Sequence, residues 1–252
     1  MRIAALDAST PTAVVGVLDG DHLELRAAMS SARAEQLLPL LDEALRSRGL
    51  APGALDAIVV GIGPGSFTGV RIAVATAKGL AWSLGKPLHA VSSMAALALG
   101  AVEGGIGPGA HVVALLDAYR REIYRGIYVL EAASLPSPAL GGLIARALAP
   151  DAVGPSTELA DAVRAAIGDA GTPVLVGGDV DVTAAEIARV GRVIEAAPRV
   201  PSARALLALG AAAHLSNPGG TLATAEPAYL RPAEAERALT EPLPPPAPPR
   251  ES

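Results

Sequence analysis

The segment from Asp56 to Leu84 constrains the fold of this chain more than any other. A continuous apolar run from Asp56 to Gly61 has the length and character of a buried strand. A glycine-rich stretch follows, and a helical pattern then extends from Gly69 to Leu84. Strand, glycine-rich turn and helix in this order are typical of an α/β fold. They also direct backbone N–H groups and a helix N-terminus toward one point, which suits an anion.

The spacing of the glycines leaves two interpretations open. Gly63, Gly65 and Gly69 do not have Walker A spacing, and no Lys-Ser or Lys-Thr pair follows them. The dinucleotide fingerprint is only approached, because no acidic residue stands about 20 positions further along. A tight strand-to-helix turn with no ligand therefore explains these residues as well as a phosphate cradle does.

Strand and helix signals follow one another in a similar order twice along the chain. Alternating apolar residues predict an antiparallel meander over residues 3–29, followed by a helix from Ala34 to Leu45. After a glycine-rich linker at 104–109 the pattern partly repeats, with strands predicted at 112–118, 122–130 and 174–176 and helices at 156–167 and 202–215. We therefore predict two related α/β halves, residues 2–103 and 110–235. The Pro-rich tail, residues 236–252, is expected to be disordered.

The composition excludes several classes of protein. The sequence contains no cysteine, which excludes disulfides, thiolate metal sites and a cysteine nucleophile. Only 2% of the residues are aromatic, so the core must be packed from aliphatic side chains. No apolar run approaches the roughly 20 residues that span a bilayer, and we expect a cytoplasmic protein without membrane contact. A net charge of −5 argues against a large phosphate-binding surface.

The identities of the residues in the glycine-rich segment are more specific than the spacing of its glycines. The run from Asp56 to Ile72, with Gly-Pro-Gly-Ser-Phe-Thr-Gly-Val-Arg at 63–71, closely resembles the segment that identifies the TsaB family, also called YeaZ. The resemblance to this segment continues at residues 77–81. Further motifs match in the same order at 5–10, 35–40, 117–124 and 227–231. Over about residues 2–235 the chain is therefore identified as a member of this family.

The resemblance implies both a fold and a role. TsaB is similar to TsaD, the subunit that transfers a threonylcarbamoyl group to N6 of adenosine 37 in tRNA. Both belong to the actin-like ATPase (ASKHA) superfamily, so we expect an α/β fold with two RNase H-like halves. The implied function is that of a non-catalytic dimerisation or scaffold subunit that binds TsaD. The alternative is a stand-alone small-molecule kinase or ATPase of the same superfamily, which would turn over ATP without a partner.

The metal motif of TsaD is not kept here. That motif, His-Met-Glu-Gly-His, aligns with residues 93–97, where Ser93 and Leu97 replace the two histidines. The four histidines of the chain contain no i,i+4 pair that could share a metal on one helix face. We therefore expect no catalytic residue, no metal and no cofactor in this subunit, and assign ATP and a metal to the wider complex. A peptidase function finds no support, because the chain has no thiol and no Gly-x-Ser-x-Gly elbow.

The expected functional surface is a partner interface on the two N-terminal helices. Their apolar arcs are wider than one sheet contact needs, although packing against neighbours within the chain is the commoner cause of such arcs. The resemblance implies that TsaB pairs with TsaD through these helices, forms a homodimer when alone, and reaches TsaE and tRNA through the complex. The expected interface residues are Leu37, Leu38, Leu41, Leu45, Val70, Ala73, Val74, Ala77, Leu80 and Ala81. Loops that could face a nucleotide contribute Asp7, Ser9, Gly63, Gly65 and Ser66.

Overall fold

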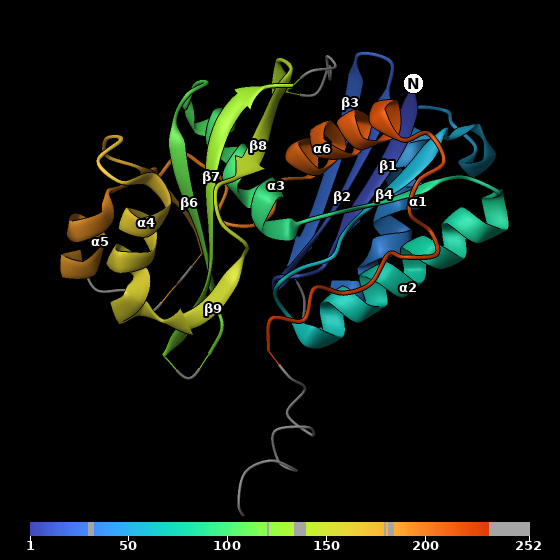
Figure 1. Ribbon diagram of the computed structural model, residues 1–252. Coiled ribbons are helices and arrows are strands. Elements are labelled where there is room, and N and C mark those ends of the chain that lie inside the picture. Colours follow the sequence, from blue (N-terminus) through green and yellow to red (C-terminus); the bar gives the residue numbers. More distant parts are fainter. Residues whose placement is uncertain (30–32, 120, 134–139, 179, 181–183, 232–252) are drawn as a thin grey trace, which may run out of the picture.

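The computed structural model describes residues 1–29, 33–119, 121–133, 140–178, 180 and 184–231. Within these ranges the chain forms two mixed β-sheets with helices between them and on their outer faces (Figure 1). The predicted tail, residues 236–252, and the last four residues of the predicted second half lie outside the described residues.

The first sheet contains the predicted meander and two parallel strands. Its strand order is β3-β2-β1-β4-β5. β1 pairs antiparallel with β2, β2 pairs antiparallel with β3, and β4 and β5 run parallel to β1. The strands are β1 (Arg2–Asp7), β2 (Thr12–Asp19), β3 (His22–Met29), β4 (Ala57–Gly61) and β5 (Leu88–Val91).

The second sheet has the same connectivity. Its order, β11-β10-β6-β7-β8, again places an antiparallel three-stranded meander beside two parallel strands, and β9 pairs with β7 in addition. The strands are β6 (His111–Asp117), β7 (Glu122–Ala132), β8 (Leu143–Ala147), β9 (Ala152–Pro155), β10 (Val174–Gly177) and β11 (Arg192–Val193). Two sheets with one shared strand order confirm the predicted α/β fold with two RNase H-like halves.

The helices occupy three layers. α1 (Leu37–Ser47) and α2 (Phe67–Leu84) share an apolar core with the first sheet, and α4 (Leu159–Ile167) and α5 (Ala184–Val190) share one with the second. α3 (Ser93–Leu99) and α6 (Ala203–Ser216) lie between the sheets (Figure 1). Short 3₁₀ segments also occur among the described residues, namely η1 (Arg33–Gln36), η2 (Pro52–Ala54), η3 (Gly100–Gly104) and η5 (Ser156–Glu158).

The two central helices pack against the sheet that is distant in sequence. α3 follows the first sheet in the chain but contacts β6, β7 and β8, whereas α6 comes near the C-terminus and contacts β1, β2, β4 and β5. One apolar cluster consequently contains residues of both sheets. The boundaries at residues 103 and 110 stay a prediction, because spatial packing crosses them.

Serine side chains fix the start of three helices. Ser66, Ser92 and Ser202 precede α2, α3 and α6, and each accepts hydrogen bonds from backbone N–H groups of the first turn. α2 ends at Leu84 and is capped by Gly85, whose φ of 64° is left-handed, so a residue without Cβ is favoured there. None of the helices within the described ranges combines the length and the apolar character needed to cross a bilayer.

Candidate functional site

The glycine-rich loop packs directly against the loop that follows β1. The Ser66 N–H donates a hydrogen bond of 2.7 Å to the Ser9 carbonyl oxygen. A Cβ atom added at Gly65 would overlap the Ser9 carbonyl oxygen, and one added at Gly69 would overlap the carbonyl oxygen of Ala8. These two glycines therefore let two loops of the same chain approach each other closely.

Several backbone N–H groups of this loop already have partners within the protein. Gly63 N–H donates to Ser93 Oγ at 2.9 Å, and Gly69 N–H donates to Ser66 Oγ at 3.3 Å. Together with the bond from Ser66 to Ser9, they satisfy donors that a phosphate cradle would direct at its ligand. Of the two interpretations that the spacing left open, the geometry favours the tight turn.

Asp7 lies at the centre of this packing and is wholly buried. Its Oδ1 atom accepts hydrogen bonds of 2.7 Å from both the N–H and the hydroxyl of Ser9, and its Oδ2 atom accepts one of 2.5 Å from Ser93 Oγ. Burial raises the pKa of Asp7, and the hydrogen bonds from the two serines oppose that rise. The five residues expected to face a nucleotide are thus brought together, but Asp7 faces Ser9 and Ser93.

The position of the TsaD metal motif lies inside the protein core. Ser93, Met94 and Leu97 are all fully buried on α3. The Ser93 hydroxyl is committed to Asp7, and the Leu97 side chain offers no ligand atom. The residues at this position therefore do not fit a metal ion. In the part of the chain that the structure describes, no group of three or more His, Cys, Asp or Glu residues is placed to hold one.

A second carboxylate, which is half-buried, lies at the start of α3. Asp151 accepts a hydrogen bond of 2.8 Å from Ser92 Oγ and one of 2.5 Å from the hydroxyl of Tyr128. Burial raises the pKa of Asp151, and the same two hydrogen bonds oppose that rise. Since Ser92 also caps α3, this cluster ties the start of α3 to β7. Sequence analysis missed Asp151 and Tyr128, which stand in no motif.

Most of the side chains expected in the partner interface are buried. Eight of the ten pack between α1, α2 and the first sheet, namely Leu37, Leu41, Leu45, Val70, Ala73, Val74, Ala77 and Ala81. Leu38 is 50% exposed, and Leu80 is half-buried against the same cluster. The apolar arc formed by these eight residues thus packs against the first sheet, and their place in a partner interface stays a prediction.

The accessible side of α2 carries a different set of residues. Ile72 is 38% exposed, Trp82 is 81% exposed, and Ala75 and Gly79 between them are also exposed. Spacings of three, four and three residues place these four on one stripe of the helix, which we call the α2 outer stripe. Figure 1 shows α2 on the outside of the first sheet, on the opposite side of the molecule from α4 and α5. The lone tryptophan of the chain was the signal that could have identified this face.

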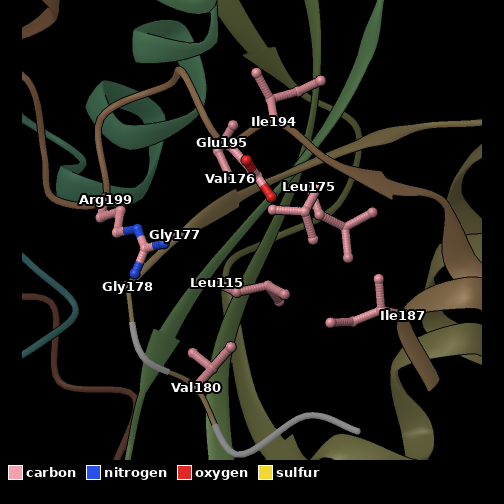
Figure 2. A pocket seen from close by; sticks show the side chains of 11 residues that line it. Leu115, Leu175, Val176, Gly177, Gly178, Val180, Ile187, Ile194, Glu195 and Arg199 are labelled. Carbon is pink, nitrogen blue, oxygen red and sulfur yellow. The ribbon is translucent and has the colours of Figure 1, made fainter. Parts of the chain in front are cut away.

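A small pocket lies in the second half of the chain. Its volume is about 210 Å³, and its walls come from β6, β10, α5, β11 and the segment after β11 (Figure 2). The walls are mainly apolar, with Leu115, Leu175 and Ile187 on one side and Glu195 and Arg199 as the charged side chains. Pockets that hold drug-sized ligands measure roughly 300–1,000 Å³. None of the predicted site residues lines this pocket.

Comparisons with known proteins agree with the motifs. A family described as "TsaD: tRNA N6-adenosine threonylcarbamoyltransferase" matches residues 27–239. The solved structure of YeaZ from Pseudomonas aeruginosa superimposes with a TM-score of 0.72 and 31% identity, covering 91% of this chain and 100% of that one. The chain belongs to the TsaB (YeaZ) family.

Curated TsaB proteins match this chain over part of its length. The protein named "tRNA threonylcarbamoyladenosine biosynthesis protein TsaB" of Haemophilus influenzae is 35% identical over 125 residues, and that of Bacillus subtilis is 38% identical over 132. These segments cover 49% and 51% of this chain. They span about half of the two relatives, 52% and 55% of their lengths.

Proposed function

We propose that this chain is the non-catalytic partner subunit of a cytoplasmic complex that forms threonylcarbamoyladenosine in tRNA. It binds a TsaD-type catalytic subunit and supports threonylcarbamoyl transfer to N6 of adenosine 37. The observation that carries the proposal is that Ser93 and Leu97, at the two histidine positions of the aligned TsaD motif, are buried, with the Ser93 hydroxyl hydrogen-bonded to Asp7. A metal-dependent transfer requires ligands at the metal, and Ser93 and Leu97 supply none at this position.

The α2 outer stripe is the surface we assign to the catalytic subunit. Ile72 and Trp82 are large exposed hydrophobic residues on one face of an 18-residue helix, and Leu38 of α1 is a third on the N-terminal helix pair. Ala75 and Gly79 lie between them, and a Cβ at Gly79 would meet nothing within 4 Å. Small residues flanked by large apolar ones let a partner helix approach closely and bury the large ones at its sides.

The same stripe serves self-association when the catalytic subunit is absent. A homodimer and the TsaD heterodimer would then exclude each other, because both cover Ile72 and Trp82. TsaE and tRNA contact this subunit only within the complex, and ATP and the metal are bound by the other subunits. The net charge of −5 agrees with a subunit that leaves most tRNA contacts to its partners.

Reconstitution tests the proposal. Purified TsaD-type subunit, the other proteins of the system, tRNA, threonine, bicarbonate and ATP are combined with and without this chain, and modified adenosine is measured by mass spectrometry. We expect modification only when the chain is present. The isolated chain is assayed in parallel for ADP release with candidate small-molecule acceptors. ATP turnover by the isolated chain would show a stand-alone kinase or ATPase and overturn the non-catalytic role.

A further inference from the structure

The segment that follows α6 runs back across the molecule as a strap, residues 218–231. Near its start Thr221 N–H donates a hydrogen bond of 2.6 Å to the Leu88 carbonyl oxygen, and Ala90 N–H donates one of 3.3 Å to Thr221 Oγ1. Ala225 is 1% exposed within the core shared by α1, α2 and the first sheet. Figure 1 shows the strap as the orange-red segment that passes from α6 along α2. This part of the strap is anchored on the first half of the molecule.

The end of the strap is held at the N-terminus of α2. Ala228 N–H donates to the Ile62 carbonyl oxygen at 2.8 Å. The Tyr229 ring lies 5.3 Å from the Phe67 ring, and its hydroxyl accepts a hydrogen bond of 2.6 Å from Arg71 Nε. The Arg71 guanidinium also stacks on Phe67, 4.0 Å from the ring centroid. The Phe67 ring and the Arg71 guanidinium of the first half thus hold Tyr229 of the strap.

Two residues further on, the strap contacts the second half. Arg231 Nη1 donates a hydrogen bond of 2.7 Å to the Ala118 carbonyl oxygen in the turn between β6 and β7. The same guanidinium forms an ion pair with Glu122, the first residue of β7. The Arg231 and Glu122 side chains are only 15% and 30% exposed, so solvent screens this pair less than it screens a fully exposed one.

We propose that Tyr229 and Arg231 form a latch that fixes the two halves of the molecule relative to each other. Two residues of extended chain span at most about 7 Å. With both contacts made, the turn between β6 and β7 therefore stays close to the N-terminus of α2. With either contact broken, the two halves are joined through the central helices and the chain connections alone, and the turn is free to move away from α2.

The latch links the second half, through the strap, to the helix that carries the α2 outer stripe. Arg71 and Ile72 are neighbours on α2, and Arg71 holds Tyr229. The affinity of a partner bound to the stripe would therefore depend on whether the latch is closed. This coupling rests on the proposed function, whereas the latch itself does not.

Distances between spin labels on the isolated chain test the latch. The sequence has no cysteine, so Ser83→Cys on α2 and Asp161→Cys on α4 give one label on each half without further changes. Distances are measured by pulsed electron resonance with the latch residues intact, and in Tyr229→Ala, Arg231→Ala and the milder Tyr229→Phe and Arg231→Lys. Arg146→Ala, which removes an exposed ion pair with Glu131 inside the second sheet, is the matched control.

We expect Tyr229→Ala and Arg231→Ala to add a population at longer distances that is about tenfold larger than with the latch intact, a factor corresponding to ~1.4 kcal/mol. The milder variants should give smaller increases, and Arg146→Ala none. If an alanine variant does not fold, as judged by circular dichroism, the distance distribution of the milder variant at the same residue is used to test the latch. Identical distance distributions in all folded variants would overturn the latch, even if their melting temperatures fell. Loss of the latch with normal tRNA modification would leave the proposed function standing.

Discussion

Ser93 donates a hydrogen bond of 2.5 Å to the buried carboxylate of Asp7, across 86 residues of sequence. The family resemblance aligns Ser93 with the first histidine of the TsaD motif, and Asp7 ends the first strand. Gly63 N–H donates to the same serine oxygen, so the pair also holds the glycine-rich loop. Asp7 and Ser93 therefore form a small polar core that positions two loops.

Replacing Asp7 by asparagine should change how stability depends on pH. Burial raises the folded-state pKa of Asp7 above its ordinary value of 3.8. The contribution of Asp7 to the free energy of unfolding is therefore greatest below the unfolded-state pKa and declines as pH rises through the folded-state pKa. The free energy of unfolding is measured in urea for the wild type and Asp7→Asn. The value of the variant relative to the wild type should increase from about pH 4 to about pH 8. A pH-independent difference between the two proteins would contradict the assignment.

Two glycines of α2 should respond to alanine with opposite signs. A Cβ at Gly69 would overlap the Ala8 carbonyl oxygen, whereas one at Gly79 points into open space. We expect Gly69→Ala to lower the free energy of unfolding by about 1–3 kcal/mol. Gly79→Ala should raise it by roughly 0.5–1 kcal/mol, because alanine is the better helix former. Equal effects in urea titrations would mean that the close approach of the two loops is not as described.

His89 and His214 should make the protein sensitive to mild acid. The Nε2 atom of the buried His89 lies 3.1 Å from Nδ1 of His214, so one ring must donate and the other accept. Burial, and then the charge of His214, lower the pKa of His89 from 6.5. Stability contributed by neutral His89 is therefore present above the unfolded-state pKa and lost as pH falls through the folded-state pKa.

Thermal melts of the wild type and His89→Gln between about pH 7.5 and pH 5 check this expectation. The wild type should lose more of its melting temperature on acidification than the variant does. His22→Gln, at an exposed position on β3, serves as the control and should keep the wild-type pH dependence. Parallel curves for the wild type and His89→Gln would rule out the histidine pair as the cause.

Much of the fold could be predicted because its main elements have clear local patterns. The strands His22–Met29 and Ala57–Gly61 are found where alternation and a continuous apolar run place them. β8, β9, α5 and β11 were not predicted, since they are short, from two to seven residues, and carry little periodicity. The packing of α3 and α6 against the distant sheet is a long-range relationship that no local pattern contains.

The candidate site was harder to predict than the fold. α2 is apolar or small on most of its sides, so periodicity could not tell the side that faces the sheet, with Ala73 and Ala77, from the outer side, with Ile72 and Trp82. The loop motifs identified the family correctly, but they could not show that Asp7 faces serines. That contact depends on how two loops far apart in the sequence fold together.

Arginine substitutions at buried and at exposed positions of α2 should have different effects on folding. Ala77 is fully buried, so Ala77→Arg should bury an unpaired charge and unfold the first half. Trp82 and Ile72 are exposed, so Trp82→Arg and Ile72→Arg should keep the far-ultraviolet circular dichroism of the wild type. An unaltered spectrum for Ala77→Arg would show that α2 is seated differently on its sheet.

Calorimetric titration of these exposed-site variants with the TsaD-type subunit tests the central claim most directly. Val193→Arg, at a position of the second sheet that is 48% exposed, is the control for adding an arginine at a surface apolar site. We predict that Trp82→Arg and Ile72→Arg each weaken binding by at least about 2 kcal/mol, roughly thirtyfold in affinity, while Val193→Arg binds like the wild type. Wild-type affinity in both folded α2 variants would contradict the assignment of this helix as the docking surface.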